Sequence, residues 1–411
     1  IRNNPIWCRK MAQRMREIDN GQELVALFVN EINPYLLKSY NILFAVTERY
    51  GLRVGSLRRK IERLVGKGEA NRLLTSITQP GELLASLGPV AGLTKVASGE
   101  MSREEYMEKW GHRMASEMEV SIPRPCEDPS WLDRQLKELN QSPYDIDAMF
   151  ARQRSELDDI WEQFRNRYPG KTKLIRNKFK KVAEDSRLRE GTRSEYTRVY
   201  YICRLWCLRA GELTGIGDDA FFLNMDELHS LLSGKEAPMA NIPIRKQTYE
   251  KYKKLPAYPR IICGRFDPLK WVADPDRCSD IFDSHEPPSE RGEKTVSAKT
   301  IIGIPGSAGV AEGLVRRLDS PEEGDRLEQG EILVTSLTNI GWTLIFPRAG
   351  AIVTDIGAPL SHAAIVAREL GIPGVINCGN ATTRLYTGDR VRVDGIEGTV
   401  EILETRESSE A

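Results

Sequence analysis

The chain has 411 residues, enough for two or three domains, and its 59 basic and 59 acidic side chains cancel. This balance gives no electrostatic argument for a nucleic acid or a membrane surface as partner, and we find neither a bilayer-spanning apolar run nor a signal peptide. Seven scattered cysteines without CxxC spacing predict a reduced, cytoplasmic protein with no metal site. The first residue, Ile1, is not methionine, which is consistent with a fragment or a processed piece.

The segment from residue 7 to about residue 98 is predicted to be helical. Its apolar residues recur at spacings of three and four, as in Leu24, Leu27 and Phe28, and this is the period of an amphipathic helix. Asn33-Pro34 and Gly51-Leu52 interrupt the pattern.

Residues 110–131 form a different kind of segment. Prolines at positions 123, 125 and 129 predict an irregular path across the helical region. Arg113 and Glu117 are four residues apart in it, and a structural clamp of ion pairs explains them as well as a binding surface does.

Residues 145–185 are highly charged and predict a long helical hairpin. Within them, Gly170-Lys171-Thr172 imitates the end of a nucleotide-binding P-loop. That motif requires a glycine five residues earlier, where this chain has Arg165, and a preceding strand that the pattern does not predict. We therefore reject it.

Residues 187–222 read as a helix with two stripes, followed by an acidic segment that ends in Phe222. An apolar stripe includes Val199 and Trp206, and a basic stripe beside it includes Arg189 and Arg193. By spacing alone, a basic stripe is most often a solvated face.

A polar, proline-bearing linker is predicted next, and a compact α/β domain follows it. The linker covers roughly 285–300 and contains His285, to which we assign no role. The α/β domain covers 301–404, with a short buried strand at 331–335 and a closing hairpin at 391–403.

The most informative stretch of the chain is AIVTDIGAPLSHAAIVARELGIPGVI, residues 351–376. It predicts a buried strand, a break at Asp355-Ile356-Gly357, and a helix that starts at Ser361-His362. In the first turn of a helix the dipole disfavours a cationic imidazole, so His362 is expected to be a neutral nucleophile. A phosphoryl group on it would face the unpaired N–H groups of the helix start. A helix-capping histidine without chemistry is the alternative.

Residues 354–375 resemble the phosphohistidine signature of the phosphoenolpyruvate-utilising enzymes, which include phosphoenolpyruvate synthase, pyruvate phosphate dikinase, phenylphosphate synthase and rifampin phosphotransferase. The shared core is S-H-A-A-I-V-A-R-E-L-G-I-P, residues 361–373; one departure is Ala358-Pro359, where the family has a second glycine. The resemblance implies that His362 is phosphorylated on a small swivelling domain. The other matching positions are Thr354, Gly357, Ser361, Arg368 and Glu369.

The helical part resembles the acceptor-binding domain of rifampin phosphotransferase. The matching positions of the irregular segment are Arg113, Glu117, Glu119 and Arg124. Arg189 and Arg193 match an R-E-x-x-K helix, with Arg193 in place of the lysine. In the family this helix faces the incoming phosphohistidine. The resemblance therefore implies that both arginines stabilise the moving phosphoryl group, because a guanidinium can donate hydrogen bonds to two phosphoryl oxygens at once.

The predicted architecture is a mainly α-helical acceptor-binding domain (1–284), a flexible linker (285–300), a swivelling α/β phosphohistidine domain (301–404) and a tail (405–411). The resemblance implies transfer of a phosphoryl group from ATP, through His362, to the hydroxyl of a small organic acceptor, phenols included, with AMP and phosphate as the other products. ATP and magnesium are expected on an ATP-grasp domain or subunit outside this chain, which itself binds no cofactor or metal. The alternatives are a phosphocarrier like phosphoenolpyruvate synthase, and a non-catalytic regulatory subunit that keeps the fold.

Overall fold

The structure is a computed structural model of the chain. It describes residues 3–75, 85, 87–114, 116–141, 146–256, 258–259, 261–274, 277, 281–285, 299–359 and 361–405. Most of the predicted linker, from 286 to 298, and the predicted tail from 406 lie outside the described residues.

The chain divides into two compact units, each of which is assembled from separate stretches of sequence. The first unit comprises residues 1–45, 111–128 and 191–290, and the second comprises residues 46–110, 129–190 and 291–411. The boundaries predicted at 284, 300 and 404 remain predictions.

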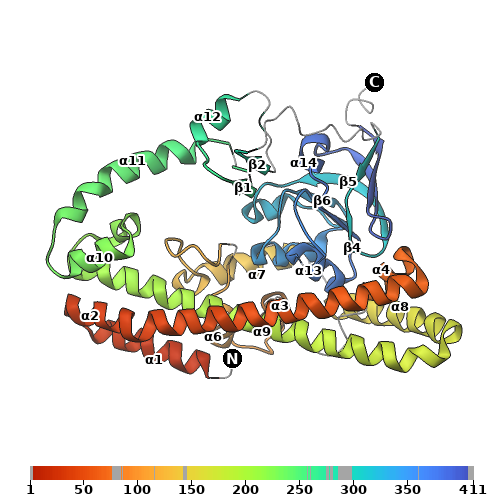
Figure 1. The fold of residues 1–411 in the computed structure, drawn as a ribbon, viewed down its shortest axis with the longest axis horizontal. Helices are drawn as coiled ribbons and strands as arrows, with labels where there is room; N and C mark the ends of the chain where they lie inside the picture. Colours follow the sequence, from red (N-terminus) through yellow and green to blue (C-terminus); the bar gives the residue numbers. More distant parts are fainter. Residues whose placement is uncertain are drawn as a thin grey trace. The chain divides into compact units, whose positions relative to one another are not determined.

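Helices dominate the first 280 residues, as the apolar spacing predicts (Figure 1). Their bounds are α1 Asn4–Glu17, α2 Gly21–Leu27, α3 Asn33–Val65, α4 Lys67–Thr75, α5 Gly88–Ala97, α6 Arg103–Trp110, α7 Trp131–Gln141, α8 Ile146–Arg167, α9 Pro169–Thr214, α10 Met225–Leu232, α11 Asn241–Lys253 and α12 Pro268–Ala273. A π-helical turn, Phe28–Ile32, joins α2 to α3, and short 3₁₀ helices cover Pro125–Glu127, Gly217–Phe222 and Ala237–Ala240. Two short parallel strands, β1 Ile261–Cys263 and β2 Ile281–Asp283, pair with each other.

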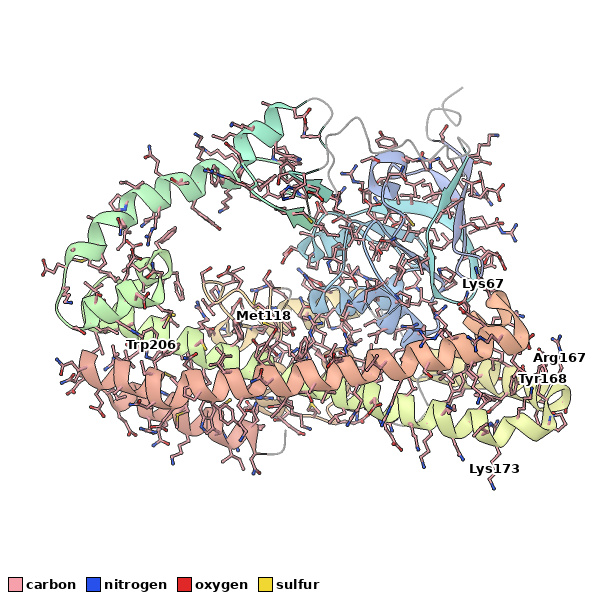
Figure 2. All side chains as sticks on the ribbon, viewed as in Figure 1. Lys67, Met118, Arg167, Tyr168, Lys173 and Trp206 are labelled. Atoms are coloured by element: carbon pink, nitrogen blue, oxygen red, sulfur yellow. The ribbon has the colours of Figure 1, made fainter. Side chains whose placement is uncertain are left out.

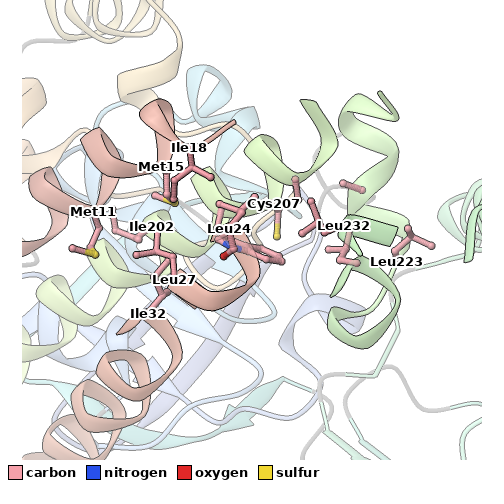
Figure 3. Close-up of a cluster of buried hydrophobic side chains, with 14 of the residues drawn as sticks. Met11, Met15, Ile18, Leu24, Leu27, Ile32, Ile202, Cys207, Leu223 and Leu232 are labelled. Carbon is pink, nitrogen blue, oxygen red and sulfur yellow. The ribbon is translucent and has the colours of Figure 1, made fainter. Parts of the chain in front are cut away.

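The core of the first unit is the apolar stripe that the sequence predicts on α9. Ile202, Trp206 and Cys207 pack with Leu24 and Leu27 of α2, together with residues of α1 and α10 (Figure 3). The indole N–H of Trp206 is also satisfied in this core, because it donates to the Leu24 carbonyl oxygen at 2.9 Å. Cys203 packs against the same cluster, so Cys203 and Cys207 both contribute to this apolar core.

The predicted helical hairpin of the second unit is confirmed as α8 followed by the first half of α9. Arg167 and Tyr168 lie where α8 gives way to α9 (Figure 2). Trp161 and Phe164 of α8 pack with Phe179 of α9, and Tyr50 of α3 joins the same core. The Tyr168 hydroxyl stabilises the turn between α8 and α9 by donating to the Leu64 carbonyl oxygen at 2.9 Å.

An eight-stranded mixed sheet is built by residues 300–404. Its order is β3-β10-β9-β5-β6-β7-β8-β4. The strands are β3 Thr300–Ile302, β4 Ile304–Ser307, β5 Val310–Arg317, β6 Ile332–Thr335, β7 Ala351–Thr354, β8 Gly374–Ile376, β9 Arg390–Asp394 and β10 Thr399–Glu404. Neighbours from β5 to β8 run parallel, and β9 and β10 form the predicted antiparallel hairpin.

Both faces of the central strands are covered, which explains why β6 and β7 are apolar throughout. Leu333 and Ile352 pack on the face that holds α13 (His362–Leu370), while the alternating residues Val334 and Val353 pack on the face that holds α14 (Ala381–Arg384). Side chains of a strand alternate between faces, so a doubly covered strand reads as a continuous apolar run. The chain is therefore mostly helical with an α/β body at its C-terminal end, in agreement with the predicted fold class.

Candidate active site

His362 is the first residue of α13, directly after the loop that leaves β7. The predicted strand and helix are confirmed: β7 ends at Thr354, α13 begins at His362, and Gly371 ends the helix in the left-handed conformation at φ 67°. Ser361 occupies the N-cap position, but its side chain makes no capping hydrogen bond, and its buried hydroxyl oxygen has no partner among the described residues. The sequence predicts the position of this cap correctly, but the capping bond is not formed.

The loop between β7 and α13 brings together three of the predicted site residues. A β-carbon at Gly357 would lie 3.3 Å from Ser361 Oγ, 3.4 Å from Thr354 Oγ1 and 3.0 Å from the Ile376 side chain. Gly357 is therefore needed for close approach rather than for a positive φ angle. The Thr354 hydroxyl holds the loop by donating to the Ile356 carbonyl oxygen at 3.1 Å.

The half-buried imidazole of His362 lies between two threonine hydroxyls. Nδ1 is 3.1 Å from Thr338 Oγ1, and Nε2 is 3.0 Å from Thr343 Oγ1. The Phe346 ring packs beside the imidazole at 5.8 Å between centroids. A hydroxyl both donates and accepts, so this pair satisfies a neutral imidazole in either tautomer and leaves one nitrogen with a lone pair. The arrangement suits a nucleophile.

Arg368 and Glu369 lie at the far end of the same helix, and both side chains are buried. The Arg368 guanidinium donates to the Pro359 carbonyl oxygen and so ties the end of α13 back to the loop before His362. Glu369 Oε1 has no hydrogen-bond partner among the described residues, and burial raises the pKa of Glu369 well above its ordinary value. A supporting role for Arg368 and Glu369 in the reaction remains a prediction.

Arg189 and Arg193 lie one turn apart on α9, but the compact units divide between them. Arg189 pairs with Glu190 at 2.9 Å and lies over the Tyr50 ring, so it is largely buried. Arg193 is one-third exposed and lies 3.5 Å from Glu117. Each guanidinium thus has its own carboxylate, and convergence of the two on one phosphoryl group remains a prediction.

The solvated face that spacing alone favours for the basic stripe is not found in the middle of α9. Arg204 is buried, because its guanidinium donates to both carboxylate oxygens of Glu127 at 2.9–3.0 Å and to the carbonyl oxygens of Val120 and Ser121. The irregular segment 111–128 therefore covers this part of α9 and supplies the acidic and carbonyl partners that the basic residues need. Helical spacing cannot reveal such a partner, because it comes from a distant part of the sequence.

Arg113 and Glu117 form a buried ion pair within the irregular segment. Arg124 is also buried and donates to the backbone carbonyl oxygens of Ser116 and Glu117 at 3.2 and 3.0 Å. Both the clamp and the binding interpretation are compatible with these contacts, and the exposed Met118 marks the outer side of the segment (Figure 2).

The comparison with known proteins bears on the His362 site. Residues 327–398 match the family described as "PEP-utilising enzyme, mobile domain". The part of the chain around His362 is thus similar to the mobile domain of the PEP-utilising enzymes. The matched range contains His362 and both threonines that contact its ring.

Curated relatives extend the similarity into the helical part. Rifampicin phosphotransferase of Bacillus subtilis is 28% identical over 76% of this chain and 36% of its own length, and that of Bacillus cereus is 33% identical over 45% and 19%. "Prodigiosin synthesizing transferase PigC" of Serratia marcescens is 28% identical over 72% of this chain and 32% of its own length. The chain thus spans about a third or less of these relatives. A solved structure of aconitase X from Thermococcus kodakaraensis aligns with a TM-score of 0.21, which is too low to inform the fold.

Thr338 and Thr343 are the residues of the His362 site that sequence reasoning missed. Thr338 precedes the 3₁₀ turn Ile340–Leu344 and Thr343 lies within it, in a segment that the sequence places before the histidine motif without assigning it a role. Nothing in the sequence around these two threonines indicates a catalytic role, because they reach the imidazole only when this turn packs against α13.

In the described part of the chain, no group of three or more His, Cys, Asp or Glu side chains is arranged to hold a metal ion. None of the described helices is long and apolar enough to cross a bilayer.

Proposed function

We propose that this chain is the phosphoryl-carrying and acceptor-binding part of an ATP-dependent phosphotransferase. His362 receives a phosphoryl group that comes from ATP and passes it to the hydroxyl of a small organic acceptor. AMP and phosphate are the other products, and one water molecule is consumed. ATP and magnesium are bound by an ATP-grasp domain or subunit other than these residues.

The observation that carries this proposal is the environment of His362. Both ring nitrogens lie 3.0–3.1 Å from threonine hydroxyls, and the residue begins a helix. When one nitrogen attacks phosphorus, the N–P bond forms and the bond from phosphorus to its leaving oxygen breaks. The threonine on the other nitrogen can then hold the ring N–H, which keeps the imidazole oriented. The positive end of the helix dipole favours the negative oxygens that arrive.

A carrier is required because the nucleotide and acceptor are bound on different parts of the enzyme. Direct in-line transfer needs the reacting atoms about 3–3.5 Å apart, which two distant sites cannot provide. Arg189 and Arg193 are proposed to spread charge off the phosphoryl group during discharge to the acceptor, since little else stabilises a loose transition state of this kind. The relatives are named for rifampicin and for prodigiosin synthesis, so the proposal defines the acceptor by its hydroxyl alone.

The proposal is tested by charging the chain with labelled ATP in the presence of its ATP-binding domain or subunit. The wild type is expected to gain acid-labile, base-stable phosphate, and His362→Ala is expected to lose it completely. His285→Ala serves as the matched control, because His285 lies outside the proposed site and should charge normally. Label that persists in His362→Ala, or its absence from the wild type, would refute the proposal.

A further inference from the structure

Four buried side chains of the first compact unit contain more hydrogen-bonding groups than their surroundings satisfy. We call His112, Arg113, Glu117 and Arg124 the His112 cluster; their exposed fractions are 3%, 4%, 4% and 1%. Among the described residues, His112 Nδ1, Arg113 Nη1, Glu117 Oε2 and Arg124 Nε find no hydrogen-bond partner. Each buried polar atom left in this state costs about 1–3 kcal/mol. Glu117 Oε2 still has an ion-pair partner in Arg193, 3.5 Å away, but the three nitrogen atoms have none, and three such atoms in one cluster indicate that a partner belongs there.

The tautomer of His112 is fixed by its contact with α9. His112 Nε2 lies 3.0 Å from the Ser194 carbonyl oxygen. A carbonyl oxygen accepts but does not donate, so Nε2 must carry the proton and Nδ1 must carry the lone pair. Burial, reinforced by the charges of Arg198, Arg113 and Arg124, holds the pKa of His112 well below 6.5, and the Ser194 carbonyl opposes this effect. The ring is therefore neutral near pH 7, with an unused basic nitrogen.

The charge of the cluster favours an anion. Arg113 and Arg124 contribute two cations against the single carboxylate of Glu117, which Arg193 also approaches at 3.5 Å. Arg124 donates to neutral carbonyl oxygens, and no ion pair with a carboxylate is seen for it among the described residues. The unpartnered N–H groups on Arg113 and Arg124 are donors of the kind that phosphoryl oxygens accept.

We propose that His112 is the general base of the discharge step, and that Arg113 and Arg124 hold the phosphoryl oxygens beside it. This inference rests on the proposed function. The acceptor oxygen forms its bond to phosphorus, the N–P bond to His362 breaks, and that electron pair returns to the imidazole. The hydroxyl proton moves to His112 Nδ1 and later leaves to water. An arriving phosphoryl dianion offsets the nearby arginines, so His112 becomes more basic when a base is needed.

The first test uses inorganic phosphate as the probe and needs no acceptor or nucleotide. The four histidines of the ¹⁵N-histidine-labelled chain are followed by NMR near pH 7, and the His112 signals are identified by their loss in His112→Gln. Phosphate is expected to shift the His112 nitrogens toward the protonated pattern. His229, which is also partly buried in the first unit, is the internal control and should not move. An unmoved His112, or equal shifts at both residues, would overturn the inference.

The second test separates proton transfer from structural support. In His112→Gln, the side-chain N–H₂ can still donate to the Ser194 carbonyl oxygen, but the basic Nδ1 is gone. We expect this variant to fold and to charge His362 normally, and to discharge to the acceptor about 100-fold more slowly or worse. Discharge at the wild-type rate would show that the ring is structural. If His362 is never charged, the proposed function fails, while the phosphate titration still decides the inference about His112.

Discussion

The two histidines His362 and His112 have opposite surroundings. His362 is half-buried and contacts neutral hydroxyls on both ring nitrogens, which can donate or accept as the ring requires. His112 is buried beside arginines, and one nitrogen is committed to a carbonyl oxygen. The first arrangement tolerates a change of bonding at either nitrogen, whereas the second permits a single tautomer.

This difference shows why a histidine alone does not define a role. A carrier must form and break a covalent bond, so its neighbours must adapt to both states. A base has to keep one lone pair available in one direction, so rigid neighbours suit it. Variants that change the neighbours rather than the rings therefore test the comparison most directly.

The largest effect is expected for Arg193, which connects the His112 cluster to a partly exposed position on α9. Arg193→Ala should slow discharge to the acceptor by about a thousandfold, as loss of a transition-state arginine does in other phosphoryl transfers. Charging of His362 should be unchanged, and Arg193→Lys should retain more activity than alanine, because the R-E-x-x-K helix that this stretch resembles has lysine at the matching position. Single-turnover discharge of phospho-His362 measures the effect.

The matched control is Arg245→Ala, which removes another partly exposed arginine paired with a carboxylate, at 39% exposure against 32% for Arg193. It should discharge normally. Normal discharge by Arg193→Ala would mean that Arg193 supports structure alone.

A moderate effect is expected from the hydroxyls around His362. Replacing both Thr338 and Thr343 by valine keeps their shape and removes two hydrogen bonds, each worth about 0.5–1.5 kcal/mol. If both bonds act in the transition state, charging of His362 should slow by roughly 5- to 150-fold. The rate of label incorporation from ATP measures this.

Thr335→Val is the control for these variants, because the Thr335 hydroxyl is fully buried and has no hydrogen-bond partner among the described residues. It should charge at the wild-type rate and be at least as stable. If the double variant of Thr338 and Thr343 charges at the wild-type rate, the two hydroxyls do not contribute to the charging of His362.

The smallest effect concerns the buried carboxylate on the helix of His362. The pKa of Glu369 is raised in the folded state, so its ionisation opposes folding, and stability is lost as pH rises from the ordinary value of 4.5 toward the folded pKa. Glu369→Gln should match the wild type below pH 4.5 and become the more stable protein above it, by about 1–2 kcal/mol at alkaline pH. Urea unfolding across the pH range measures the difference.

The stability contribution of Glu227 should depend on pH in the opposite direction to that of Glu369. Its hydrogen bonds with Arg245 lower the pKa of Glu227 to about 2, so its contribution to stability is present above pH 4.5 and is lost as pH falls toward 2. Glu227→Gln should therefore lose its difference from the wild type in acid. A Glu369→Gln variant whose stability follows the wild type at every pH would contradict the assigned pKa shift.

Much of the fold follows from local pattern. Apolar residues with a period of 3.6 predict the long helices. Continuous apolar runs predict β6 and β7, because both faces of these strands are buried and neither face carries polar side chains. The start of α13 at His362 follows from the motif itself. The sequence could not assign the basic stripe of α9, because its solvation depends on whether another segment covers it.

The sequence by itself determined the strand, loop and helix that present His362, since these depend on residues close together along the chain. The tertiary structure decided the partners: Thr338 and Thr343 reach the imidazole because a 3₁₀ turn packs against α13, and Ser194 fixes the tautomer of His112 from 82 residues away. Local propensity sets the backbone at each position. Hydrogen-bond partners and burial, which set the chemistry of a side chain, come from segments that meet only when the chain is folded.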